Sequence, residues 1–95
     1  VDRSCSPEFE EEISDFVRKQ DGVLGIDLLH TRLFGNRIYI DIEIEADGEL
    51  SLRESHAIAE NVHDNLEEAY PKIKHIMVHV NPYTPSNPES NSGEM

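Results

Sequence analysis

The fold is decided by one stretch of strictly alternating residues, Ile38-Tyr39-Ile40-Asp41-Ile42-Glu43-Ile44-Glu45. Successive side chains of a β-strand point to opposite faces of a sheet, so the isoleucines share one face and the polar residues share the other. The pattern predicts a strand over about 37–46 that has one face in a core and the other face open. Repulsion along the row of carboxylates on the open face requires either free access to water or a bound cation.

Two further strands flank this stretch. One is expected over about 23–33, and the dipeptide Gly35-Asn36 marks the hairpin turn between it and the alternating strand. The other is expected over about 72–81, where apolar residues alternate with Met77 and His79.

Two helices complete the predicted elements. Ser6-Pro7 is typical of a helix start, with a serine cap and a proline in the first turn, and Gly22 is expected to stop that helix. Ser51 and Glu54 form a capping box that opens a second helix, which Pro71 ends. The buried stripe of the second helix is expected to contain Leu52, Ser55, Ile58, Ala59, Val62, Leu66 and Ala69.

The element order is therefore α-β-β-α-β, which predicts a single α+β domain over residues 6–82. The connection from the second strand through the helix to the third is long enough for a right-handed parallel crossover, so we expect a mixed three-stranded sheet with both helices on one face. Residues 1–5 are expected to be a linker, and residues 83–95, which are rich in Pro, Ser, Asn and Glu, are expected to be a disordered tail.

The chain is strongly acidic, with a net charge of −12 over 95 residues. Such a surface repels nucleic-acid phosphates and anionic lipid headgroups, so we expect no nucleic acid and no direct lipid binding, whereas cations are attracted. No apolar run approaches the roughly 20 residues of a membrane-spanning helix. The single cysteine, Cys5, cannot form an internal disulfide, which fits a reducing compartment.

The open face of the predicted sheet is a candidate metal site. Asp27, Asp41 and His79 can project from it together, and carboxylates with an imidazole are common ligands of divalent cations. The hairpin register is open at this point, because a two-residue turn places His30 beside Asp41, whereas a three-residue turn with a bulge places Asp27 there. The face also carries apolar side chains among its charges, which is typical of a dimer surface; we assign to it Tyr39, Met77 and Leu29.

These residues also have ordinary interpretations. His79 fits a half-buried histidine that binds nothing, and Asp41 fits a solvated carboxylate on a strand. The second helix carries polar residues at i, i+4, i+7 and i+11, and pairs of them could hold an ion, although the spacing alone favours a solvated face. These helix residues are His56, Glu60, His63 and Glu67.

Four segments together resemble the C-terminal cytoplasmic domain of cation diffusion facilitator transporters. They are 22–32 (GVLGIDLLHTR), 39–44 (YIDIEI), 52–62 (LRESHAIAENV) and 78–82 (VHVNP), and the resemblance covers residues 8–82. It implies a ferredoxin-like, metallochaperone-like α-β-β-α-β fold, a V-shaped homodimer and regulatory binding of divalent cations. It also implies a membrane domain of the same transporter, which exports a divalent metal from the cytosol in exchange for protons.

The resemblance further implies which residues bind the metal. The ligand positions of the family correspond to Asp27, Asp41, His56, His79 and Asn81, and Tyr39 stands at an aromatic position that lines the site in some members. Asn81 replaces a common aspartate, Asp27 and Asp41 stand where some zinc exporters have histidine, and His30 stands where arginine is usual. The ligand set is therefore rich in oxygen, which makes manganese or iron the alternative ion. Zinc remains the expected ion, because it accepts mixed histidine and carboxylate ligands.

We therefore interpret the chain as the dimeric, metal-sensing cytoplasmic domain of a cation efflux transporter, on the cytoplasmic side of a membrane, in which metal binding closes the dimer. One alternative is a free-standing cytosolic metal chaperone of ferredoxin-like fold. The other is a small ferredoxin-like enzyme. An enzyme is not expected, because the sequence contains no nucleophile elbow, no glycine-rich loop between a strand and a helix, and no placeable Arg–Asn pair for acyl-phosphate chemistry.

Overall fold

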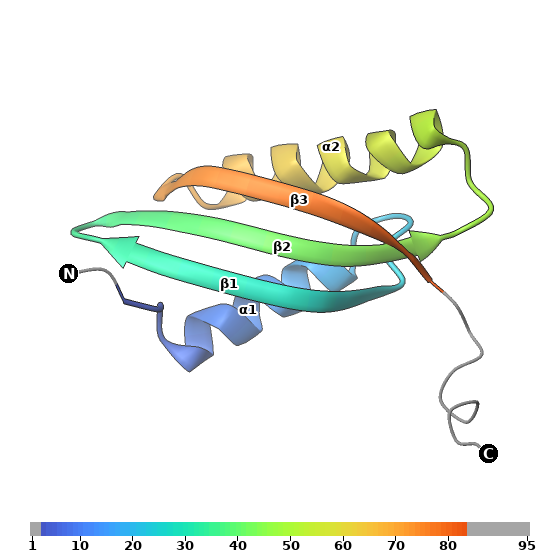
Figure 1. Ribbon diagram of the computed structural model, residues 1–95. Coiled ribbons are helices and arrows are strands. Elements are labelled where there is room, and N and C mark those ends of the chain that lie inside the picture. The colour runs from blue at the N-terminus through green and yellow to red at the C-terminus, as the bar shows by residue number, and fades with distance from the viewer. Residues whose placement is uncertain (1–2, 84–95) are drawn as a thin grey trace, which may run out of the picture.

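The computed structural model describes residues 3–83, which form five elements along the chain (Figure 1). They are α1 (Pro7–Arg18), β1 (Gly25–Phe34), β2 (Arg37–Asp47), α2 (Leu52–Ala69) and β3 (Ile73–Tyr83). The order expected from the sequence is confirmed. Of the tail expected over residues 83–95, all but Tyr83 lies outside the described residues, and Tyr83 is the last residue of β3. Neither helix in the described part of the chain is long and apolar enough to cross a lipid bilayer.

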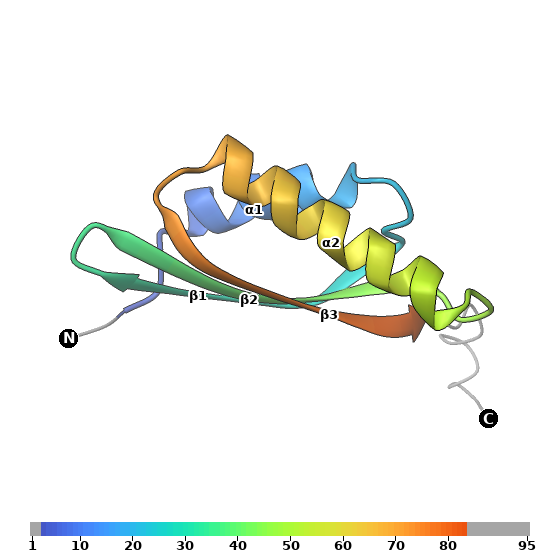
Figure 2. The ribbon, with the colours of Figure 1, turned by 90° about the horizontal axis from the view of Figure 1, so that it is seen from above.

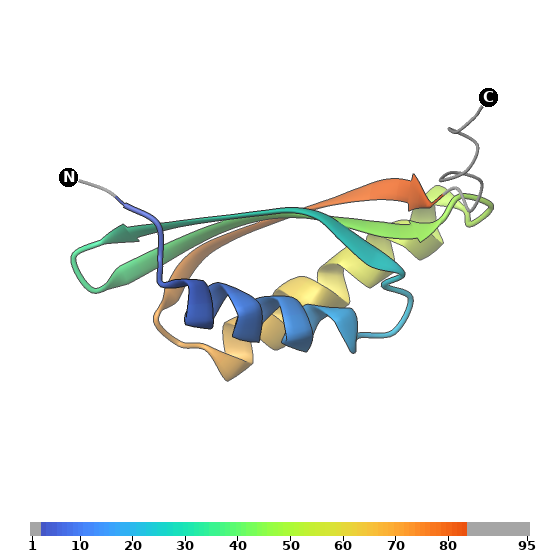
Figure 3. The same ribbon diagram turned by 90° about the horizontal axis from the view of Figure 1, so that it is seen from below.

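β2 is the central strand of the sheet. β1 pairs with it in antiparallel orientation and β3 pairs with it in parallel orientation. Both helices lie on the same face of the sheet, as the views from above and below show (Figures 2 and 3). The predicted mixed sheet with two helices on one face is therefore confirmed, and within residues 3–83 no element covers the other face.

The core lies between β2 and the two helices. Ile40, Ile42 and Ile44 are fully buried on the face of β2 that the helices cover. Burying one such aliphatic side chain contributes about 1.5–3 kcal/mol, and a shift of one residue would turn all three to the opposite face. The alternating isoleucines therefore determine which face of the sheet receives the helices. The helices contribute four fully buried side chains to this core, Ile13, Val17, Val62 and Leu66.

Both helix starts agree with the sequence. Ser6 Oγ accepts a hydrogen bond from Phe9 N at 3.1 Å, which caps α1. In α2, Ser51 Oγ accepts from Glu54 N at 3.0 Å, and Ser51 N donates to Glu54 Oε1 at 2.9 Å, so the capping box is confirmed. α1 ends earlier than expected, at residue 18, and Gly22 adopts a positive φ of 84° in the turn that follows.

The buried stripe of α2 is narrower than expected. Ile58 packs partly against the core, but Leu52 is 86% exposed and Ala69 is exposed as well. Helix side chains tilt toward the N-terminus, so Leu52, the first residue of α2, extends beyond the turns that contact the sheet. Ala69 lies in the last turn, past the buried Leu66. The assignment of both residues to the stripe was wrong.

The segment before α1 is attached to the edge of β1. The carbonyl of Arg3 accepts a hydrogen bond from Leu33 N at 2.6 Å, and Cys5 N donates to Thr31 Oγ1 at 2.9 Å. Thr31 is fully buried, and its hydroxyl donates to the Glu10 carboxylate at 2.5 Å. The described part of the expected linker therefore packs on the domain, with Cys5 only 9% exposed.

Candidate metal-binding site

The face of the sheet that the helices leave uncovered, here called the open face, carries most of the candidate ligands. It contains the half-buried β2 residues Tyr39, Asp41, Glu43 and Glu45. The pairing with β3 places beside them, in that order, His75, Met77, His79 and Asn81. The pairing with β1 places on their other side, again in order, Arg32, His30, Leu28 and Gly25.

The hairpin between β1 and β2 has the two-residue turn Gly35-Asn36, and it pairs His30 with Asp41. One of the two registers left open by the sequence is thereby selected. In this register the even-numbered residues of β1 from Leu28 onward share the open face. Leu29 therefore lies on the covered face, packed against the core, and its expected place on the open face was wrong. Leu28 takes that place and is 46% exposed.

A bulge in β1 brings Asp27 to the open face as well. The register shifts between Ile26 and Leu28, so Asp27 is the extra residue on the β1 side. Its carboxylate contacts the side chains of Asn81 and Glu45, which belong to the open face. The structure therefore combines the two-residue turn of one alternative with the bulge of the other, and Asp27 lies farther along the sheet than the pair of Asp41 and His30.

Asp27, Glu43, Glu45 and Asn81 form a group that we call the carboxylate cluster. Asn81 Nδ2 donates to Asp27 Oδ2 at 2.9 Å and to Glu43 Oε1 at 3.1 Å. A hydrogen bond between the carboxyls of Asp27 and Glu45 raises the pKa of Glu45, and partial burial and the negative charge of Asp27 act in the same direction. The Glu45 carboxyl therefore holds its proton more firmly than an isolated carboxyl does, at a point where a cation would relieve the same repulsion.

Asp41 and His79 share the open face but are not direct neighbours. Across the strands, Asp41 pairs with Met77, whereas His79 pairs with Glu43. Within residues 3–83, Asp27, Asp41 and His79 do not bring their ligand atoms within 4.8 Å of one another. The predicted ligands on the strands therefore lie in a row along the sheet rather than in a closed site.

The end of the open face next to the hairpin is aromatic. The Tyr39 ring lies 5.0 Å from the Phe34 ring and 5.6 Å from the His75 ring, measured between centroids. The Arg32 guanidinium carbon lies 6.0 Å from the Phe34 centroid. Tyr39 precedes Asp41 on the same face of β2, so it borders the candidate ligands while its ring packs on aromatic neighbours.

His56 is not brought to the open face. It is exposed on α2 and lines a shallow hollow with Glu60, His63 and Val78. Val78 pairs with a buried isoleucine of β2 and belongs to the face of β3 that α2 covers. In one protomer, His56 and the ligands of the open face therefore lie on opposite sides of β3.

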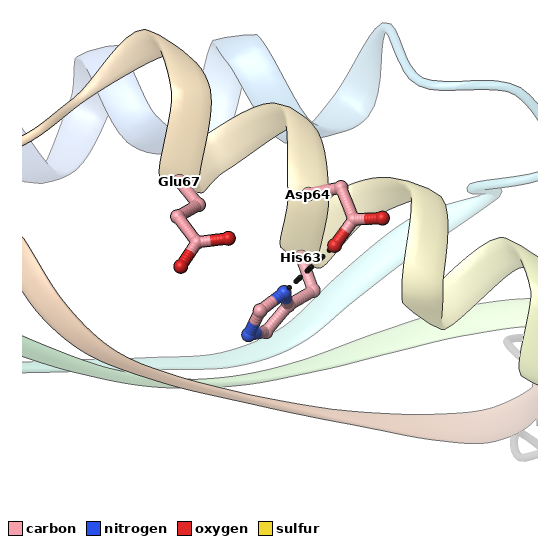
Figure 4. Close-up of side chains that lie close together, drawn as sticks. All are labelled: His63, Asp64 and Glu67. Carbon is pink, nitrogen blue, oxygen red and sulfur yellow. Dashed lines mark hydrogen bonds and ion pairs between the residues drawn. The ribbon is translucent and has the colours of Figure 1, made fainter.

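One group of metal-ligating side chains is already gathered on α2. His63, Asp64 and Glu67 each offer a ligand atom, and these atoms all lie within 4.8 Å of one another (Figure 4). His63 Nδ1 is 3.1 Å from Asp64 Oδ1. Asp64 was not expected to act with His63, because sequence neighbours on a helix are not expected to face each other. Glu43 and Glu45 were likewise placed on the open face but not recognised as partners of Asp27 and Asn81.

Comparison with known sequences gives one consistent family. The family described as cation efflux protein, cytoplasmic domain, matches residues 5–83. The manganese efflux system protein MneP of Bacillus subtilis is 26% identical over 83 residues, which cover 87% of this chain and 28% of MneP. The cation-efflux pump FieF of Shewanella oneidensis is 28% identical over 82 residues, which cover 86% of this chain and 27% of FieF. The chain thus spans less than a third of the length of these relatives.

Solved structures share the fold. A nickel form of a MamM CTD variant matches with a TM-score of 0.79 and 23% identity, over 83% of this chain and 100% of that chain. A cadmium form of another MamM CTD variant matches with a TM-score of 0.79 and 22% identity, over 82% of this chain and 98% of that chain. At these identities the likeness establishes the fold, and it agrees with the metallochaperone-like α-β-β-α-β order.

Proposed function

Because this chain belongs to the family of cytoplasmic domains of cation efflux proteins, we propose that it binds a divalent cation on the open face. We propose that this binding regulates a transporter. The observation that carries the proposal is the carboxylate cluster, in which Asn81 donates to Asp27 and Glu43 and the Glu45 carboxyl contacts Asp27. A divalent cation there offsets local repulsion and part of the net charge of −12.

The proposed ligands are Asp27, Asp41, His79 and Asn81, and Tyr39 borders the site. Asn81 now directs its amide nitrogen at two carboxylates. Rotation of the carboxamide by half a turn would present Oδ1 to a cation instead, because the two ends of an amide are a donor and an acceptor of similar shape. The ligands must be deprotonated to bind a metal ion, so binding is accompanied by proton release.

The functional unit that we propose is a homodimer. The open face exposes Leu28, which is 46% exposed, and Met77, which is 44% exposed, among its charges. His56 lies on the other side of β3 from His79, so it would complete the site of a second protomer rather than its own. Neutralising carboxylates that face each other removes repulsion between protomers, so metal binding closes the dimer.

The donor set suits several divalent ions. Carboxylate and amide oxygens favour manganese and ferrous iron, and the relative from Bacillus subtilis is named for manganese efflux. Mixed histidine and carboxylate ligands also suit zinc. In a purified domain zinc should bind most tightly of the three, because affinities generally follow the order manganese, iron, zinc.

We further propose that the domain serves a longer transporter and lies on the cytoplasmic side of a membrane. The membrane part of that transporter would export the divalent cation from the cytosol in exchange for protons. The names of MneP and FieF both refer to efflux, and this chain matches less than a third of each.

Isothermal calorimetry with zinc, manganese and ferrous iron at pH 7.5 tests the site on the open face. Asp27→Ala, which removes a carboxylate of the cluster, should weaken the tightest binding by more than tenfold, since even losses outside the ligand sphere cost about 10–100-fold. Asp21→Ala is the matched control, because it removes the same charge from an exposed position in the turn before β1. Equal losses in the two variants would show that binding follows net charge and would refute the site.

A further inference from the structure

We propose that the C-terminal half of α2 carries a second divalent-cation site, formed by His63, Asp64 and Glu67 of a single protomer (Figure 4). An imidazole nitrogen and two carboxylate oxygens already lie within 4.8 Å of one another. Ligands at zinc bond lengths of roughly 2.1 Å in a tetrahedron are about 3.4 Å apart, so small rotations of these side chains close the site. Three protein ligands and a water are the usual arrangement of an open zinc site.

His63 is held in a suitable position before any ion arrives. Its side chain is 40% exposed, and Nδ1 lies 3.1 Å from Asp64 Oδ1. The Glu67 carboxylate and the His63 ring extend from the same side of α2 (Figure 4). His63 also lines the shallow hollow shared with Glu60 and Val78, which leaves room for the water that completes the coordination. The ion would take the place of the proton in the contact between His63 and Asp64.

The charges of α2 favour a cation at this point. The last turn of the helix contains no basic residue, while Asp64, Glu67 and Glu68 approach the negative end of the helix dipole. Within residues 3–83, the only ion pair of Asp64 is with His63, and Glu67 has no hydrogen bond or ion pair. This carboxylate is therefore available as a ligand, and no lysine or arginine in the described part of the chain compensates it.

This second site is separate from the site proposed on the open face. All of its ligands come from one helix, which lies on the other side of the sheet (Figure 2). His56, the helix residue proposed for the other site, precedes His63 by seven residues, which is about 10 Å along the helix axis. Binding to the α2 site needs no second protomer, so it should be independent of dimer closure.

Zinc titration of the whole chain, followed by calorimetry and by the imidazole resonances of His63, tests the proposal. We expect two classes of sites, of which the weaker shifts the His63 resonances. Glu67→Gln should weaken this class by at least tenfold. Glu68→Gln is the matched control, because it removes the same charge from the adjacent exposed position and should leave the affinity unchanged within twofold.

Different experimental outcomes would refute the two proposed sites. Asp41→Ala should abolish or weaken the tighter class while the His63 resonances still respond to zinc. Equal effects of Glu67→Gln and Glu68→Gln, or His63 resonances that do not respond to saturating zinc, would overturn the α2 site and leave the open-face site standing. Thermal melting of each variant without zinc checks that the fold is intact, which is expected because both glutamates are exposed.

Discussion

Replacing the buried Thr31 by valine is expected to destabilise the domain by about 1.5–4.5 kcal/mol. The substitution keeps the shape of the side chain and removes the hydroxyl that accepts from Cys5 N at 2.9 Å and donates to Glu10 at 2.5 Å. Cys5 N would be left buried without a partner, which costs about 1–3 kcal/mol. Glu10 is partly exposed and can turn to water, so its lost hydrogen bond adds about 0.5–1.5 kcal/mol.

Urea unfolding followed by circular dichroism measures this loss, with Thr31→Ser as the control. Serine retains the hydroxyl and loses one methyl group, so it should cost about 1 kcal/mol. A small domain has a total stability of about 5–15 kcal/mol, so both variants should fold. Hydrogen exchange at Cys5 N should accelerate with valine and not with serine. A valine variant as stable as the serine variant would refute the role of this hydroxyl in attaching residues 3–5 to β1.

In calorimetry, the tighter zinc binding should weaken more than tenfold with Asp41→Ala or His79→Ala and much less with His63→Ala; equal losses would contradict the assignment. Zinc affinity should fall from about pH 7.5 to 5.5, because histidine must be neutral to bind a metal and free histidine protonates near pH 6.5. Small-angle scattering should show compaction by zinc only at the higher pH. The pKa of Glu45 is raised in the folded state, so its stabilising contribution is present below the unfolded pKa near 4.3 and is lost as the pH rises through the folded value. Glu45→Gln should therefore raise the melting temperature at pH 7 but not near pH 3.5, and no rise at pH 7 would argue against the pairing with Asp27. Light scattering at micromolar concentration without metal should give the mass of a dimer, and a monomer mass would count against the open face as a dimer surface.

The fold was predictable because its determinants are local. The period of two in β2 identifies the covered face without knowledge of the partner strands, and the capping box of Ser51 and Glu54 marks the start of α2 within four residues. The limits of the buried stripe were less predictable. Whether Leu52 meets the sheet depends on where the helix begins relative to the strand ends, which is a property of the assembled layers.

Most residues of the site could be predicted from the sequence, but the contacts between their side chains could not. The bulge at Asp27 depends on the pairing of β1 with β2, and its local sign is weak: Gly25 leaves room for Glu45, whose Oε1 would be 2.7 Å from a Cβ at that position. Periodicity therefore placed Asp27 only as one of two alternatives. Asn81 was expected as a ligand, and its role as the donor that holds two carboxylates together needs coordinates from all three strands.

The open face is polarised along its length, with aromatic rings near Tyr39 and the carboxylate cluster around Glu45. Glu45 lies six positions after Tyr39 on β2, which is roughly 20 Å along the strand. If two copies contact each other at their aromatic ends, that contact is the pivot of the dimer and the two carboxylate clusters lie at the ends that can move apart. A change of charge at the carboxylate clusters then acts far from the pivot, where it has the largest effect on the angle between the protomers. A small change of that angle moves the carboxylate clusters by several ångströms.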